Sequence, residues 1–581
     1  MSKKRVLVGS LLLMMATAAQ SQDSSYTVIV TSTFSPTISD AQQKINEKAN
    51  IVDTNTVKQE VSYNISSPVY ISQFTPEPIA APKVGRDQIA RLYRNFIKFG
   101  FGYPWTPYLD FEVNNLRSTR YAFGVRAFHH STWGRVKDYA PAQHSDTRIG
   151  VFGQKFFNDY TLYAGADYNY LMVTCYGIPD STFPFKVTAK DIRNQFHHVR
   201  TQVNFSRNAP KDAHVFNQFY GIDYNYCSGE HQLGFKTDLN QDIKVAKITY
   251  LNLGGEIGVN YYHNEWLGRI IYLPNDVTLN FKPYASLNYK EYFLKAGFNI
   301  VMLFPNIIRD DTRVYFYPDI QARLHIVPNI FTIYAGIDGG LRRNSYLSFV
   351  QENPYLSNNL FFTGFMNEKL RMFGGMKIGL SRSLSIGAKA SYSFCEDMPF
   401  FINDALGIRD SNGFIISLQL GHTFSVVYNN TKWLNLHFDL SYTYKQQLYL
   451  TLNLDYNGYE TEDLYKPWYK PAFVGNLDMR YILLNKFVFN LATFVHTGIF
   501  YPEFEWNTNT YEWNTRAKTL RPAFDFNFGF EYLWSKRLAF FANVNNFTYQ
   551  RNYYYYDYPS QRINFLLGVK YNFGGESVGK K

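Results

Sequence analysis

Residues 562–573 read RINFLLGVKYNF, and this stretch decides the fold. From Ile563 to Phe573 every second residue is large and apolar, whereas the residues between them are mostly polar or small. A period of two predicts a β-strand with one apolar and one polar face. The same alternation recurs at 434–445 and 524–534. Each run has about the 9–11 residues that a tilted strand needs to cross a lipid bilayer.

The composition agrees with this pattern. The 581-residue chain is 46% hydrophobic and 18% aromatic, yet its mean hydropathy is only −0.29. So many aromatic residues exclude a disordered chain. Beyond the N-terminus no run of about 18–20 uncharged apolar residues occurs, which excludes a helical membrane protein. Strands with one apolar and one polar face explain why a chain rich in apolar residues has a mean hydropathy near zero. Averaging the hydropathy along such a strand cancels the contributions of its two faces.

Twenty-two alternating segments can be placed between residues 94 and 573, and single-chain outer-membrane barrels have an even number of strands. The length of each connection depends on whether the segment before it has an even or an odd number. Those after even-numbered segments are mostly tight, such as 430–432, and those after odd-numbered segments are mostly long, such as 397–413 and 447–470. These barrels have short periplasmic turns and long extracellular loops. The predicted fold is therefore all-β, a transmembrane antiparallel β-barrel of about 22 strands.

A soluble antiparallel sheet with one wet face is the alternative explanation of the alternation. It is disfavoured because the apolar face is very aromatic at the strand ends, as in the girdles of membrane barrels. A soluble sandwich also has no reason to segregate loop lengths by parity. The barrel interpretation places the protein in the outer membrane of a Gram-negative bacterium, with outer-membrane lipid and the barrel-assembly machinery as partners.

The first 21 residues predict an export signal, with a basic start, a short apolar run and cleavage between Ser21 and Gln22. No cysteine follows the cut, so no lipid anchor is expected. Removing this segment lowers the formal net charge from +11 to +8, because three basic residues leave with it. That modest excess does not predict nucleic-acid binding. Three cysteines, an odd number, predict no disulfide framework.

The last hairpin carries a recognisable set of residues. It has NVNNF at 543–547, then Tyr558-Pro559, and ends in GVKYNF at 568–573. This hairpin is similar to the closing hairpin of TonB-dependent receptors, and residues 75–118 resemble the receptor-like outer-membrane barrels of Bacteroidota. The resemblance covers the barrel, and it implies uptake or passage of a solute across the outer membrane.

The resemblance has one departure, at the N-terminus. TonB-dependent receptors carry a plug of well over a hundred residues inside the barrel. Here we expect a periplasmic or lumenal segment at 22–90 that is too short for a plug, the barrel at 91–573 and a periplasmic tail at 574–581. A 22-strand barrel is wide enough to need filling. Either the lumen is open, or loops, the N-terminal segment or something else fills it.

Thr27-Val28-Ile29-Val30-Thr31 resembles the TonB box, the stretch that such receptors offer to TonB as an added strand. An accessible β-branched segment with free backbone groups suits strand addition. Ordinary extended segments contain such residues too, so both interpretations stay open.

No catalytic set, metal site or cofactor is predicted. His437 and Asp439 share the polar side of one predicted strand, but no serine partner accompanies them, and a polar lumen needs such residues anyway. Adjacent histidines at 129–130 and at 197–198 point to opposite faces of their strands, so at most one of each pair can join a shared site. They are better explained as polar residues at the rim of the barrel than as metal ligands. We therefore do not expect an enzyme.

Aromatic residues gather in the long loops, and exposed aromatic clusters mark surfaces that recognise sugars or proteins. The binding candidates are Trp468, Tyr469, Trp506, Trp513 and Tyr555. The alternative is that part of each run belongs to the outer aromatic girdle.

Two functions therefore compete. The first is a TonB-dependent-receptor-like barrel for uptake or passage of a solute, which the resemblance favours. The alternative is a non-transporting barrel subunit of an outer-membrane assembly or surface-display complex. The missing full plug and the aromatic loops motivate this alternative, because such loops could dock outer-membrane lipoproteins.

Overall fold

The structure, a computed structural model, describes residues 93–115, 118, 120–181, 187–207, 216–246, 249–265, 275–305, 311–357, 364–409, 415–507 and 512–575. Within these ranges no helix is long and apolar enough to cross a membrane. The predicted signal, its cleavage site and the TonB-box-like stretch lie outside the described residues.

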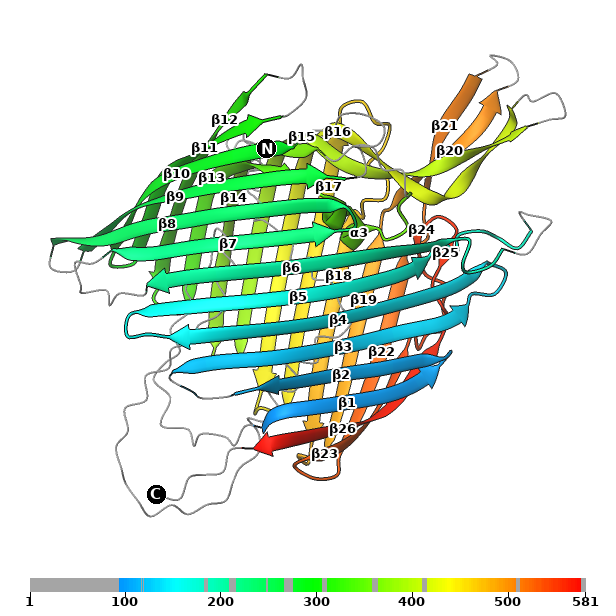
Figure 1. The fold of residues 1–581 in the computed structure, drawn as a ribbon, viewed down its shortest axis with the longest axis horizontal. Coiled ribbons are helices and arrows are strands. Elements are labelled where there is room, and N and C mark those ends of the chain that lie inside the picture. Colours follow the sequence, from blue (N-terminus) through cyan, green and yellow to red (C-terminus); the bar gives the residue numbers. More distant parts are fainter. Residues whose placement is uncertain are drawn as a thin grey trace, which may run out of the picture.

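Twenty-two strands form one antiparallel sheet, and the sheet closes because the first strand pairs with both the second and the last (Figure 1). The strands of this barrel are β1 (Tyr93–Tyr103), β2 (Thr106–Asn114), β3 (Tyr121–Arg135), β4 (Pro141–Phe156), β5 (Tyr160–Thr174), β6 (Arg193–Arg207), β7 (Asn217–Cys227), β8 (Glu230–Ala246), β9 (Thr249–Asn264), β10 (Asp276–Tyr289), β11 (Tyr292–Phe304), β12 (Arg313–Val327), β13 (Phe331–Arg343), β14 (Phe365–Ser381), β15 (Leu384–Arg409), β16 (Ile415–Tyr444), β17 (Leu448–Thr461), β18 (Phe473–Leu483), β19 (Phe487–Thr497), β22 (Ala523–Leu533), β23 (Leu538–Asn545) and β26 (Asn564–Gly575). Outside this sheet lie α3 (Tyr346–Glu352) and two hairpins, β20 (Phe500–Asn507) with β21 (Glu512–Thr519) and β24 (Tyr553–Tyr555) with β25 (Tyr558–Pro559).

The outer face of the barrel is the apolar one. Along β1, Phe99 and Phe101 are exposed, whereas Phe96 and Lys98 are buried on the inner face. An exposed face of large apolar side chains around a closed sheet is stable only in lipid, where closure leaves no unpaired strand edge. The predicted all-β transmembrane barrel is confirmed, and it places the protein in the outer membrane.

The number of strands was predicted correctly, but two of their positions were wrong. The predicted turn at 430–432 lies inside β16, so two predicted strands are one. Residues 448–461, assigned to a long loop, form β17. The two errors cancel in the count. The run of polar residues at 429–432 looks like a turn. However, β15 and β16 are paired on both sides of this run, and most of the predicted loop 397–413 is therefore strand.

The parity of the connections agrees with the prediction. Tight turns such as 382–383, 445–447 and 484–486 join strands at one end of the barrel. The long connections 344–364 and 498–522 lie at the other end, from which the β20–β21 hairpin projects (Figure 1). The second end is therefore extracellular.

Glycines allow close approach where the barrel closes. At the β1–β26 seam, a Cβ on Gly568 would lie 2.2 Å from the Phe99 carbonyl oxygen and 2.4 Å from the Phe541 ring. Phe541 packs there with Tyr108 and Leu566 on the inner face. The seam therefore depends on a missing side chain at this position.

We expect Gly568→Ala to destabilise the barrel by roughly 1–3 kcal/mol, because the added carbon overpacks the seam. The measurement is the temperature at which the fast-migrating folded band is lost in a detergent gel. Gly153→Ala is the control, because nothing lies within 4 Å of a Cβ at that position. Equal losses in both variants would contradict a seam-specific effect.

Candidate functional site

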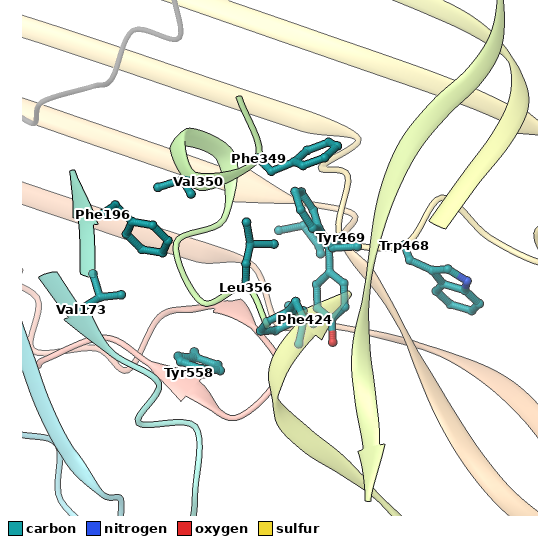
Figure 2. Close-up of a cluster of buried hydrophobic side chains, with 12 residues drawn as sticks. Val173, Phe196, Phe349, Val350, Leu356, Phe424, Trp468, Tyr469 and Tyr558 are labelled. Carbon is teal, nitrogen blue, oxygen red and sulfur yellow. The ribbon is translucent and has the colours of Figure 1, made fainter. Parts of the chain in front are cut away.

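The extracellular end of the barrel is covered by a cluster of buried side chains, which we call the aromatic cap (Figure 2). Its members are Val173, Phe196, Phe349, Val350, Leu356, Phe401, Phe424, Trp468, Tyr469, Ile499, Leu520 and Tyr558. They come from β5, β6, α3, β15, β16, β25 and the connections that follow β13, β17 and β19. In the ring of strands, β5 and β6 lie opposite β15 and β16. Contacts between these two sides can form only across the mouth of the barrel.

Residues 344–357, which we call the strap, span this distance. On one side, the buried Asn194 side chain of β6 donates to the carbonyl of Leu356 at 2.8 Å. On the other side, Leu356 forms a β-bridge with Phe424 of β16, and the Ser357 amide donates to the Phe424 carbonyl at 2.8 Å. Leu356 and Phe424 are both 0% exposed. The strap therefore ties opposite walls together.

Charged groups hold the two ends of α3. At its start, Ser345 caps the helix by accepting from the Ser348 amide, and Glu230 of β8 accepts from the Tyr346 amide at 2.6 Å. At its end, Glu352 pairs with Lys470. A helix of this length has little stability in isolation, so these contacts and the buried Phe349 fix its position.

Arg343 fixes the start of the strap to the barrel wall. Its guanidinium lies 2.6 Å from the Asp276 carboxylate and 3.4 Å from that of Glu230. The same guanidinium stacks over the rings of Tyr262 and Phe365, each 4.9 Å away. All of these partners lie at the extracellular ends of barrel strands, so the anchor is part of the wall.

Tyrosines fill the space between the strap and the remaining loops. The rings of Tyr355 and Tyr558 are 4.0 Å apart, and Tyr555 lies 5.0 Å from Phe424. The Tyr555 hydroxyl donates to the Glu352 carbonyl at 2.7 Å. Burial raises the pKa of Tyr555 and Tyr558 well above the ordinary tyrosine value, so both hydroxyls stay protonated and act as donors.

The five aromatic binding candidates separate into two groups. Trp468 and Tyr469 are only 3% and 4% exposed, and Tyr555 packs against Tyr469 in the cap. These three contact their own chain, which leaves little surface for a partner. Trp506 and Trp513 oppose each other in the β20–β21 hairpin, and their side chains lie outside the described part. Partner binding at all five stays a prediction.

Sequence reasoning missed the central residues of the cap. Phe349 and Leu356 lie in the long connection 344–364, where no periodic pattern marks a buried side, and Phe424 lies in β16, where the alternation does not tell a lipid-facing residue from one that packs under a loop. The only signal was an unusual number of apolar residues at 346–356, which a solvated loop does not need.

The predicted histidine groups do not converge. His129 contacts Thr147 at 2.8 Å, His130 faces His144 with ring centroids 6.2 Å apart, and His197 contacts Tyr168. His437 contacts Asp455 at 2.8 Å, and Asp439 lies farther away at 3.7 Å. His130 and His144 therefore lie next to each other, whereas His129, His197 and His437 each have a separate polar partner.

The inner wall is polar, and its exposure varies around the barrel. On β3 and β4, the lumen-facing side chains of Arg126 and Arg148 are 48% and 38% exposed. On β13 and β14, Asp338 and Arg371 are buried and paired. Water therefore reaches the β3–β4 side of the wall, where charges face it.

One carboxylate in the cap region is sensitive to pH. Asp557, between β24 and β25, accepts from the Tyr139 hydroxyl at 3.5 Å. Burial raises the pKa of Asp557 from 3.8 to about 6, against the smaller lowering effect of that hydrogen bond. The folded loop therefore prefers protonated Asp557, and this contribution to stability is complete below pH 3.8 and lost as the pH rises through 6.

We expect the connection 546–563 to exchange its amide hydrogens faster at pH 7.5 than at pH 5, after correction for intrinsic rates. Asp557→Asn should remove most of this difference, because an amide does not titrate. Asp138→Asn is the control, since Asp138 pairs with Arg551 at the surface at 3.2 Å. A pH dependence that survives Asp557→Asn would assign it to another group.

No protein-family model matches the sequence, and no curated protein is significantly similar to it. Solved structures are similar. The siderophore receptor PirA from Acinetobacter baumannii superimposes with a TM-score of 0.59 at 9% identity, covering 84% of this chain and 81% of the receptor. The pyoverdine outer membrane receptor FpvA from Pseudomonas aeruginosa PAO1 gives 0.58 at 11% identity, covering 84% and 80%. The chain has the fold of the outer-membrane receptor barrels. The copper transporter OprC also shares this fold, with a TM-score of 0.54 at 12% identity over 84% of this chain and 82% of OprC.

Proposed function

We propose that this protein carries a solute across the outer membrane and that its aromatic cap closes the extracellular mouth of the barrel. The observation that carries the proposal is a water-exposed, charged inner wall at Arg126 and Arg148 beneath loops joined across the mouth. A water-exposed, charged lining suits the passage of a polar solute. The shared fold with receptors and a transporter supports the same conclusion.

The test measures uptake of a labelled solute by energised cells that produce the full chain, with cells that lack it as the control. Ferric siderophores and copper are the first solutes to try, because similar structures are named for them. Saturable entry of one solute supports the proposal. A barrel that stays sealed to every solute, and that co-purifies with a lipoprotein, would support the alternative of an assembly or surface-display subunit.

Engagement of TonB belongs to the same proposal. The hairpin at 543–573 resembles that of TonB-dependent receptors, and Thr27–Thr31 has the composition of a strand that TonB could pair with. Val28→Pro with Val30→Pro removes two backbone donors, so accumulation in energised cells should fall to the level of a TonB-deficient strain. Unchanged accumulation would point to passive passage.

A further inference from the structure

The tight turns at the periplasmic end of the barrel carry charge of mainly one sign. Their described basic residues are Arg120, Lys290, Arg382, Lys445, Lys486, Lys536 and Arg537, and their described acidic residues are Asp159 and Glu291. The two acids lie in the turns before β5 and β11. Among the turns whose charged residues the structure describes, the remaining ones are purely basic.

Four neighbouring turns concentrate this charge. The turns that join β14 to β15, β16 to β17, β18 to β19 and β22 to β23 follow one another around the rim. Their basic residues, which we call the basic arc, are Arg382, Lys445, Lys486, Lys536 and Arg537. All five are exposed, and none forms an ion pair with another described residue.

The extracellular end is mixed in this respect, because Lys137 and Arg521 also form no ion pair with a described residue, whereas three other cations are paired. There Arg135 pairs with Asp180 at 2.5 Å, Arg551 with Asp138 at 3.2 Å and Lys518 with Glu503 at 2.5 Å. These cations are neutralised by carboxylates of the same chain. The charge of the basic arc, in contrast, is available to an external anion.

Each turn of the basic arc also presents an apolar side chain. Leu380, Tyr444, Leu484 and Trp534 are all strongly exposed beside the four turns. The ammonium of Lys445 lies 5.1 Å from the centroid of the Tyr444 ring. Aromatic residues at this level mark the membrane interface. The cations thus lie at the height of the lipid headgroups, next to side chains that fit acyl chains.

We propose that the basic arc binds anionic phospholipid headgroups of the periplasmic leaflet. A phosphodiester attracts both ammonium and guanidinium groups, and basic residues near a membrane surface are attracted to anionic lipids. The apolar side chains beside the turns would hold the first carbons of the acyl chains. The arc spans adjacent hairpins, so it favours several lipids side by side rather than one in a pocket.

The test uses the full chain in nanodiscs of phosphatidylethanolamine with one quarter phosphatidylglycerol. Native mass spectrometry after mild delipidation counts the retained phosphatidylglycerol. The wild type should retain it over phosphatidylethanolamine by roughly fivefold or more. Replacing all five arc residues with glutamine should bring the ratio close to the bulk composition.

A matched variant places five glutamines at the extracellular end, at Lys137, Lys190, Lys466, Arg521 and Arg562. This variant should keep the wild-type ratio. If the five-residue arc variant fails to fold, the pair Lys486→Gln with Lys536→Gln should give an intermediate ratio. A folded arc variant that retains phosphatidylglycerol like the wild type would overturn the proposal, and so would an equal loss in the extracellular variant.

Discussion

Replacing Phe424 with alanine is expected to open the mouth of the barrel and raise its ion conductance. Phe424 is fully buried, bridges to Leu356 of the strap and packs against Tyr469, Tyr555 and Tyr558. Removing a buried phenyl ring costs about 3–5 kcal/mol, and here the lost contacts are those that hold the cap to the wall. Local opening of the cap then costs much less than unfolding of the barrel.

The measurement is the single-channel current in planar bilayers, where the wild type should be nearly silent and the Phe424→Ala variant should open frequently. Phe547→Ala is the control, because Phe547 is 66% exposed and lies outside the cap. A folded Phe424→Ala barrel that stays silent would show that closure does not depend on the cap, and that other material fills the lumen.

Replacing Arg371 with methionine is expected to produce the largest loss of barrel stability. Arg371 makes two bonds of 2.5 Å to the Asp338 carboxylate, and it lies 3.9 Å from Glu368. Glu368 also accepts from Arg342 at 2.8 Å and from Ser393 at 2.7 Å. Arg371, Asp338 and Glu368 are buried, so removing the cation leaves a carboxylate without compensation. Breaking a buried pair in this way costs about 3–5 kcal/mol.

The measurement is the unfolding temperature in detergent. Adding Asp338→Leu to Arg371→Met should recover much of the loss, because the uncompensated charge is then gone. Lys369→Met is the control for the same chemistry near the surface, since Lys369 is exposed and its partner Glu396 is only half-buried, and it should cost less than about 1 kcal/mol. Similar losses at Arg371 and Lys369 would contradict the role of burial.

The fold could be predicted because its determinants are local. Each strand shows its two faces in its own sequence, as in β26, and the lengths of the connections set the orientation. The predicted strand boundaries were wrong where the local sequence pattern does not show whether a strand ends. In β16 the polar residues near Asn430 leave the membrane while the strand continues, so polarity there marks the water boundary and not a turn.

The sequence by itself determined the barrel and its direction in the membrane, because lipid outside and water inside force a period of two on every strand. The strand number came out right only because two errors cancelled. Only the tertiary structure decided what closes the mouth. Leu356 and Tyr558 come from two long connections and Phe424 comes from β16, and nothing in any one of these segments encodes their meeting. The same holds for the basic arc, whose single cations become one surface only when neighbouring hairpins pair and place their turns side by side.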